Sequence, residues 1–266
     1  GTKIGHDGEK LVVPNNPIIP YIIGDGIGID VTPVMKRVLD YAVNKAYGNS
    51  REIRWLELYA GSNSEELYGS MLPEETIEAM KEYRISIKGP LTTPIGKGHK
   101  SINVRIRQKL DLFACVRPIK YFPGTSTPMA ESGLTDMVVF RENTEDLYSG
   151  IEWEPNSPGA KRIIDFINKE LGRSPFRFEN NCGIGIKPVS EEGTKRLIRM
   201  AIDYSLAMNK SSITIVHKGN IMKYTEGAFR DWAYDVVTNE YNGIIQKDGT
   251  YIIENSQFNS EIIIKD

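Results

Sequence analysis

The sequence predicts an α/β fold with a largely parallel sheet. Short runs rich in β-branched residues alternate with longer amphipathic segments, which is the pattern of strands connected by helices. A chain of 266 residues is long enough for one large domain or two ordinary ones. No internal repeat or low-complexity tract interrupts the alternation. We therefore expect a globular α/β protein.

The order of the expected elements follows from hydrophobic periodicity. Strands are expected at 18–23, 53–59, 85–88, 112–116, 137–141, 183–186 and 213–216. Helices are expected at 32–47, 74–83, 104–110, 163–170, 191–207 and 226–241. The first helix should begin with Thr32 as N-cap and Pro33 at the first helical position. The Pro, Gly, Ser and Thr residues of 121–133 predict a crossover connection, and the polar turns of 149–182 predict an inserted arm.

The stretch IPYIIGDGIGIDV, from Ile19 to Val31, is similar to a dinucleotide-binding turn. The dinucleotide motif needs G-x-G-x-x-G/A, but Gly28 comes one residue early and Ile29 fills the position that must be small. A tight turn from strand to helix, whose glycines supply positive φ, is the favoured interpretation. Direct phosphate binding remains the alternative.

The net charge, the cysteines and the apolar runs of the sequence limit the partners and the compartment that we expect. The net charge of −2 gives no overall field that would attract nucleic acid or an anionic membrane, so neither is expected as a partner. Cys115 and Cys182 lie far apart, without metal-ligand spacing, and should be reduced. No signal peptide or membrane-spanning run is evident, so we expect a soluble, cytoplasmic protein.

The densest chemical signal is KGPLTTPIGKGHKSINVRIRQKLDLFACVRP, residues 88–118. Ser101 and Asn103 lie at the expected start of a helix, Arg107 lies on it, and Arg117 ends the next strand. A helix N-terminus with a hydroxyl, an amide and guanidinium groups is typical of a carboxylate or phosphate pocket. A solvated basic face with an ordinary cap is the alternative for each arginine taken singly.

Two further stretches contain candidate proton-transfer groups. In VVFRENTEDLYSGIEW, Arg141 closes a strand and Tyr148 follows it; a tyrosine beside cations can donate a proton, although an ordinary half-buried aromatic is the alternative. In SITIVHKGNIMKYTEGAFRDW, Lys218 follows a strand and can act as a base when desolvated, although most such lysines are solvated. No histidine has metal-ligand spacing to another ligand, so any metal would be held by oxygen.

Taken together, these motifs resemble the decarboxylating dehydrogenases of 2-hydroxy acids. IPYIIGDGIGIDVTP, SINVRIRQKLDLFACVRP, FRENTEDLYSGIEW, GIGIKPVSEEGTKRLIRMAI and VHKGNIMKYTEGAFRDW match the isocitrate/isopropylmalate dehydrogenase family from about residue 17 onward, and within it the bacterial-type NADP-dependent members. The resemblance implies mixed sheets flanked by helices, without a Rossmann fold. It implies a large-domain part at 1–112, a small domain at 113–145 and 191–266, and a clasp-like arm at the dimer contact at 146–190.

The same resemblance assigns roles to the candidate residues. It implies oxidative decarboxylation of isocitrate to 2-oxoglutarate with reduction of NADP, a reaction of the tricarboxylic acid cycle. Lys218 would take the hydroxyl proton and Tyr148 would protonate the enolate. The Ser-x-Asn pair separates this substrate from 3-isopropylmalate. The residues expected to hold the substrate carboxylates are Ser101, Asn103, Arg107, Arg117 and Arg141, and those near substrate and nicotinamide are Lys88, Leu91, Thr92 and Asn220.

Cofactors and partners follow from the resemblance too. Family members use Mg²⁺ or Mn²⁺, and their metal-binding aspartates and adenosine-binding loop are expected beyond Asp266. A homodimer is expected, with Lys218 reaching the neighbouring subunit's site. Ser101 matches a position that a kinase phosphorylates in some relatives, which implies a kinase and a phosphatase as possible partners. The alternatives are a non-catalytic fragment or regulatory subunit that binds carboxylates, or a related 2-hydroxy-acid dehydrogenase.

Overall fold

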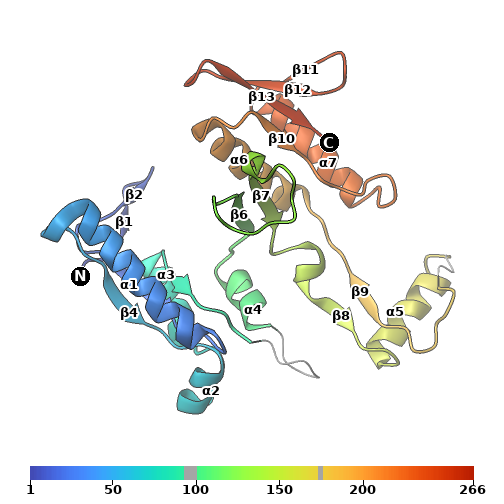
Figure 1. Ribbon diagram of the computed structural model, residues 1–266. Coiled ribbons are helices and arrows are strands. Elements are labelled where there is room, and N and C mark those ends of the chain that lie inside the picture. Colours follow the sequence, from blue (N-terminus) through green and yellow to red (C-terminus); the bar gives the residue numbers. More distant parts are fainter. Residues whose placement is uncertain (93–100, 173–175) are drawn as a thin grey trace. The chain divides into compact units, whose positions relative to one another are not determined.

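The computed structural model describes residues 1–92, 101–172 and 176–266. The chain divides into two compact units, Gly1–Asp111 and Leu112–Asp266 (Figure 1). Both units combine helices and sheets, so the predicted α/β class is confirmed. The finer division of the second unit into a small domain and an arm stays a prediction.

The first unit is built on a three-stranded parallel sheet with the order β4-β3-β5. Its residues Ile22 and Ile77 are almost fully buried and pack with Leu72, Met80 and Ile106 in one core. Its strands are β3 (Ile18–Ile22), β4 (Arg54–Glu57) and β5 (Ile87–Lys88), with a separate hairpin of β1 (Gly5–His6) and β2 (Leu11–Val12). Its helices are α1 (Gly28–Tyr47), α2 (Ser62–Tyr68), α3 (Glu74–Tyr83) and α4 (Ile102–Lys109), with a short 3-10 turn at Gly48–Ser50.

Helix α1 begins at Gly28, so the expected start at Thr32 is wrong. Thr32 is buried in the second turn, and its hydroxyl donates a hydrogen bond of 2.8 Å to the carbonyl of Ile23. The hydroxyl therefore ties the helix back to the end of β3 instead of capping the helix. Because α1 begins at Gly28, Pro33 lies inside the helix and not at its first position.

The ends of β3 and β5 approach so closely that only glycine fits. Gly24 has φ +92°, and a Cβ atom there would lie 2.3 Å from the carbonyl oxygen of Pro90. A Cβ atom on Gly89 would lie 1.9 Å from the carbonyl oxygen of Ile23. Both distances are far inside van der Waals contact. The glycines of this region therefore serve backbone packing, which supports the tight-turn interpretation.

Gly89→Ala should destabilise the first unit, because the added methyl group meets backbone atoms that cannot move aside. We expect a loss of about 3 kcal/mol in the free energy of unfolding, at the upper end for overpacking. Urea unfolding followed by circular dichroism measures it. Gly185→Ala is the control, because a Cβ atom there meets no atom within 4 Å. Equal midpoints for the two variants would contradict the packing argument.

The second unit contains a four-stranded mixed sheet with the order β10-β13-β12-β11. Helices α6 (Glu191–Ala207) and α7 (Glu226–Asn239) pack against it through a core that includes Ile202, Val236 and Ile262. The side chain of Ser190 caps α6 by accepting the backbone N–H of Gly193. The strands are β10 (Ser212–Thr214), β11 (Ile244–Ile245), β12 (Tyr251–Asn255) and β13 (Ser260–Lys265).

Two antiparallel pairs complete the second unit. β6 (Ala114–Lys120) pairs with β7 (Asp136–Glu142), so the connection between them is a hairpin loop and the expected crossover is wrong. β8 (Ile151–Trp153) pairs with β9 (Ile184–Ile186) beside α5 (Pro158–Lys169). Short 3-10 turns lie at Ser132–Leu134 and Asp146–Ser149. Only the β3-β4-β5 sheet is wholly parallel among the described strands, which corrects the expected largely parallel sheet.

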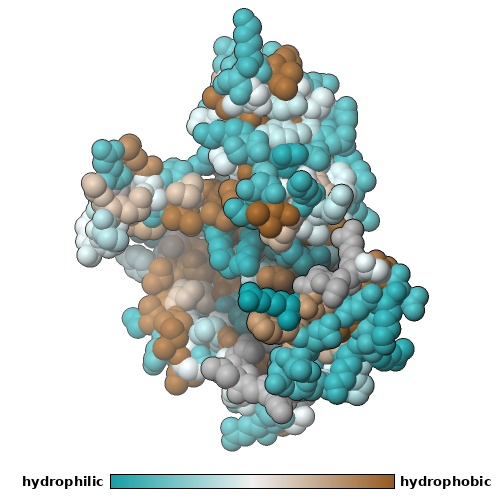
Figure 2. All heavy atoms as spheres, turned by 90° about the vertical axis from the view of Figure 1, so that its right-hand side faces the viewer, coloured by the Kyte–Doolittle hydropathy of each residue, from teal (hydrophilic) through white to brown (hydrophobic). Residues whose placement is uncertain are grey.

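Charged and polar side chains cover much of the molecular face in Figure 2, with apolar patches between them. Within the described ranges, no helix combines the length and the apolarity needed to cross a bilayer.

Candidate active site

The first group of candidate residues lies between the end of β5 and the start of α4. Ser101 is the N-cap of α4, one position before the helix begins. Asn103 and Arg107 are four residues apart on this helix and therefore share a face. The amide nitrogen of Asn103 donates to the carbonyl of Leu91 at 3.4 Å, while its amide oxygen is buried without a hydrogen-bond partner among the described residues. The segment before Ser101 lies outside the described residues.

Lys88 and Arg107 place two positive charges near one another. The ammonium of Lys88 donates to the carbonyl of Gly89 at 2.7 Å. Burial lowers the pKa of Lys88, and the positive charge of Arg107 lowers it further, while Asp25 acts in the opposite direction. A bound anion would stabilise the charged form of a lysine in this environment. This part of the first unit is therefore suited to bind a carboxylate or a phosphate.

Asp25 organises the same segment, and the sequence reasoning did not single it out. Its carboxylate accepts the backbone N–H of Ser62 and that of Thr92, each at 2.8 Å. Its own N–H donates to the carbonyl of Pro90. The carboxylate therefore anchors the segment that carries Leu91 and Thr92. The sequence feature that could have drawn attention to Asp25 is its position between Gly24 and Gly26.

Arg117 and Arg141 lie on the same face of the β6-β7 pair in the second unit. Arg141 opposes Cys115 in the register, and Arg117 is two residues along from Cys115, so the two arginines are diagonal neighbours. Both side chains are exposed, and the guanidinium of Arg117 donates to the sulfur of Cys115 at 3.2 Å. Two exposed guanidinium groups on one sheet face form a second place suited to carboxylates.

Arg141 and Tyr148 meet in one cavity. The guanidinium carbon of Arg141 lies 4.6 Å from the ring centre of Tyr148, a cation–π contact. Both residues line a cavity of about 200 Å³ together with Glu142, Glu145 and Glu226. The cavity therefore holds a guanidinium group, which can bind an anion, beside a phenol hydroxyl, which can donate a hydrogen bond. Tyr148 thus lies next to a cation, and its role in proton transfer stays a prediction.

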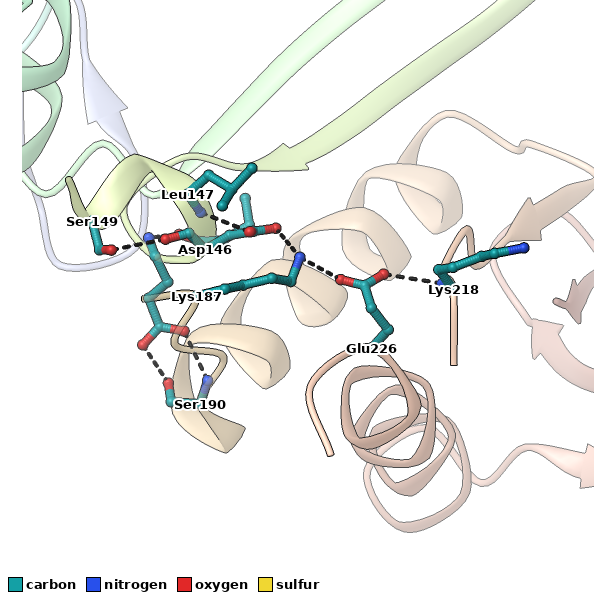
Figure 3. Close-up of polar contacts among 9 residues, drawn as sticks. Asp146, Leu147, Ser149, Lys187, Ser190, Lys218 and Glu226 are labelled. Carbon is teal, nitrogen blue, oxygen red and sulfur yellow. Dashed lines mark hydrogen bonds and ion pairs between the residues drawn. The ribbon is translucent and has the colours of Figure 1, made fainter. Parts of the chain in front are cut away.

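Lys218 lies in the loop between β10 and α7, and its side chain is exposed. Its backbone N–H donates to a carboxylate oxygen of Glu226 at 3.0 Å, and Figure 3 shows the side chain directed away from Glu226. Lys218 is not among the described residues that line the cavity of Tyr148. Asn220, two residues later, is exposed too.

A network of ion pairs and hydrogen bonds near Tyr148 was missed from the sequence. Lys187 lies between Asp146 and Glu226 (Figure 3). The backbone N–H and the hydroxyl of Ser190 each donate a hydrogen bond to a carboxylate oxygen of Glu145. The partners come from separate elements, so no sequence pattern reveals them.

The described residues include no group of three or more His, Cys, Asp or Glu side chains placed to hold a metal ion.

A family profile for isocitrate/isopropylmalate dehydrogenases matches residues 18–256, which is most of the chain. The chain belongs to this family. The candidate residues from Lys88 to Asn220 all lie inside the matched range.

Proteins and structures of the isocitrate/isopropylmalate dehydrogenase family are similar over nearly the whole chain. The isocitrate dehydrogenase [NADP] 1 of Colwellia maris is 54% identical over 100% of the chain, and the isocitrate dehydrogenase [NADP] of Pseudomonas aeruginosa is 51% identical over 100%. The chain spans 65% of the length of each of these relatives. The crystal structure of isocitrate dehydrogenase from Methylococcus capsulatus matches with a TM-score of 0.69 and 31% identity, covering 94% of this chain and 60% of that one. The fold expected from the resemblance is thereby confirmed.

Proposed function

We propose that this chain belongs to an NADP-dependent isocitrate dehydrogenase, which converts isocitrate to 2-oxoglutarate as in the tricarboxylic acid cycle. The observation that carries the proposal is the guanidinium of Arg141 stacked at 4.6 Å on the ring of Tyr148 inside one cavity. A carboxylate-binding cation beside a phenol suits a reaction in which an anionic substrate receives a proton. The identity of about half to the two named relatives supports the same reaction.

The proposed roles follow the chemistry of each side chain. Arg107, Arg117 and Arg141 bind carboxylates through their guanidinium forks, with Ser101 and Asn103 supplying a hydroxyl and an amide. Lys218 takes the proton of the substrate hydroxyl, and Tyr148 returns a proton to carbon after carbon dioxide has left. Lys88, Leu91, Thr92 and Asn220 lie near substrate and nicotinamide. When bound, NADP supplies the hydride acceptor.

Mg²⁺ or Mn²⁺ is part of the proposal, because the chain resembles a family whose members use such an ion. The described residues offer no carboxylate cluster for such an ion, so no step on this chain is assigned to it.

Phosphorylation at Ser101 belongs to the proposal as well. A phosphate at the N-cap of α4 would repel a carboxylate bound there, and a kinase and a phosphatase would be the partners.

The proposal extends to a homodimer in the cytoplasm. The β8-β9 pair and α5 suit a dimer contact, because a two-stranded sheet is marginally stable by itself and its facing residues Ile151 and Ile186 are 40% and 44% exposed. The cysteines Cys115 and Cys182 are free thiols, which suits a reducing compartment.

Reduction of NADP at 340 nm with isocitrate and Mn²⁺ tests the activity directly. We expect the whole protein that contains this chain to turn over isocitrate and not 3-isopropylmalate, because Ser101 and Asn103 are polar and favour a third carboxylate over an apolar group. Calorimetric binding of isocitrate without turnover would instead support a carboxylate-binding, non-catalytic chain. Turnover of 3-isopropylmalate would assign the chain to the related dehydrogenase.

A further inference from the structure

Lys187 follows β9 and holds two carboxylates that come from different elements. Its ammonium lies 2.8 Å from a carboxylate oxygen of Asp146 and 2.7 Å from one of Glu226. The side chain of Lys187 is 23% exposed and that of Glu226 18% exposed. The bridge is therefore shielded from much of the solvent that weakens ordinary surface ion pairs.

Each of the two carboxylates also accepts a backbone hydrogen bond in the segment that carries one of the proposed proton-transfer residues. Asp146 opens the 3-10 turn that carries Tyr148, and its second carboxylate oxygen accepts the N–H of Leu147 at 2.6 Å. The second carboxylate oxygen of Glu226 accepts the backbone N–H of Lys218 at 3.0 Å. Figure 3 shows the resulting series of contacts, from the tyrosine turn through Lys187 to the lysine loop.

The backbone holds the bridge in place at both ends. The N–H of Asp146 donates to the carbonyl of Pro188, the residue directly after Lys187. Glu226 is the first residue of α7, where the helix dipole favours a negative charge. Burial lowers the pKa of Lys187, but the hydrogen bonds and charges of Asp146 and Glu226 outweigh it and leave the pKa above its ordinary value. The ammonium therefore stays charged at neutral pH.

Without the ammonium, the bridge would become two half-buried carboxylates facing each other. Like charges at this range repel, and removing one partner of a buried charged group is strongly unfavourable. The carboxylates would move apart or take up protons. Either change would alter the turn that carries Tyr148 and the loop that carries Lys218.

We propose that Lys187 is a positioning residue, which couples the turn of Tyr148 to the loop of Lys218 through Asp146 and Glu226. The inference rests on the proposed function, because it concerns the two residues assigned to proton transfer. Lys187 acts through its ion pairs with Asp146 and Glu226, which in turn bind the backbone of the tyrosine turn and of the lysine loop.

The test compares three variants. Lys187→Met removes the charge and keeps the length of the side chain, whereas Lys187→Arg keeps a cation able to reach both carboxylates. Lys195→Met is the matched control: Lys195 bridges Glu191 at 2.6 Å and Asp235 at 2.5 Å, and its side chain is 18% exposed. The Lys195 bridge joins α6 to α7 in the same unit but leads to neither candidate residue.

In an active wild-type protein, we expect Lys187→Met to lower kcat by about tenfold with KM for isocitrate within about twofold, as for lost transition-state positioning. Lys187→Arg should restore most of kcat, and Lys195→Met should leave it within about twofold of wild type. Unchanged kcat in Lys187→Met, or an equal loss in Lys195→Met, would overturn the inference and leave the proposed function standing.

Hydrogen exchange at the backbone N–H of Lys218 provides a readout that needs no turnover. We expect exchange at this N–H to be about tenfold faster in Lys187→Met and unchanged in Lys195→Met, because only the first substitution frees Glu226. If the wild-type protein fails to reduce NADP, the proposed function fails and the exchange result decides the coupling. Equal exchange in wild type and Lys187→Met would overturn it.

Discussion

Lys218→Met should reduce the oxidation of isocitrate by about 10³-fold in kcat, within the range for loss of a general base. Methionine matches the length of lysine but cannot accept a proton. Because the side chain of Lys218 is exposed and only its backbone N–H binds Glu226, the substitution should leave the loop intact. The loss should therefore appear in kcat, with the free energy of unfolding unchanged.

The measurement is steady-state NADP reduction, with urea unfolding to check the fold. Lys223→Met is the control, because Lys223 is an exposed lysine in the same loop. That control should keep kcat within about twofold of wild type, as for a surface substitution. Retention of wild-type kcat by Lys218→Met would refute the role of Lys218 as base.

Tyr148→Phe should lower kcat by about 10²-fold, the lower part of the range for general acid catalysis, with little change in KM. Phenylalanine keeps the ring that Arg141 covers at 4.6 Å, so the cation–π contact and the wall of the cavity are preserved. Only the hydroxyl is lost. A selective loss in kcat would therefore identify the hydroxyl as the proton donor.

Tyr204→Phe is the control for this second substitution. Tyr204 is half-buried in the same unit and packs edge-on against Phe140, with ring centres 5.4 Å apart. It lies outside the set of described residues that line the cavity of Tyr148. Equal losses in the two variants would show a general effect of removing a tyrosine hydroxyl, and the assignment of Tyr148 would fail.

Local sequence signals predicted some elements residue by residue. The helices at Glu74–Tyr83 and Glu191–Ala207 have the predicted bounds, because an apolar stripe with helical spacing and an acidic first turn mark each of them. The strands β12 and β13 were missed, although each contains consecutive isoleucines, which favour strands. Their pairing with each other and with β10 creates the mixed sheet, and such pairing depends on contacts distant in the chain.

The sequence by itself indicated the α/β class through its periodicity, and the resemblance of its motifs to the isocitrate/isopropylmalate dehydrogenase family supplied the family and the roles of the candidate residues. Only the tertiary structure decided that Thr32 ties α1 to β3, that Arg141 covers Tyr148, and that Lys187 bridges Asp146 and Glu226. Asp146 and Lys187 are 41 residues apart in the sequence. Contacts of this kind depend on the close approach of separate elements, which the order of residues along the chain does not encode in any local pattern.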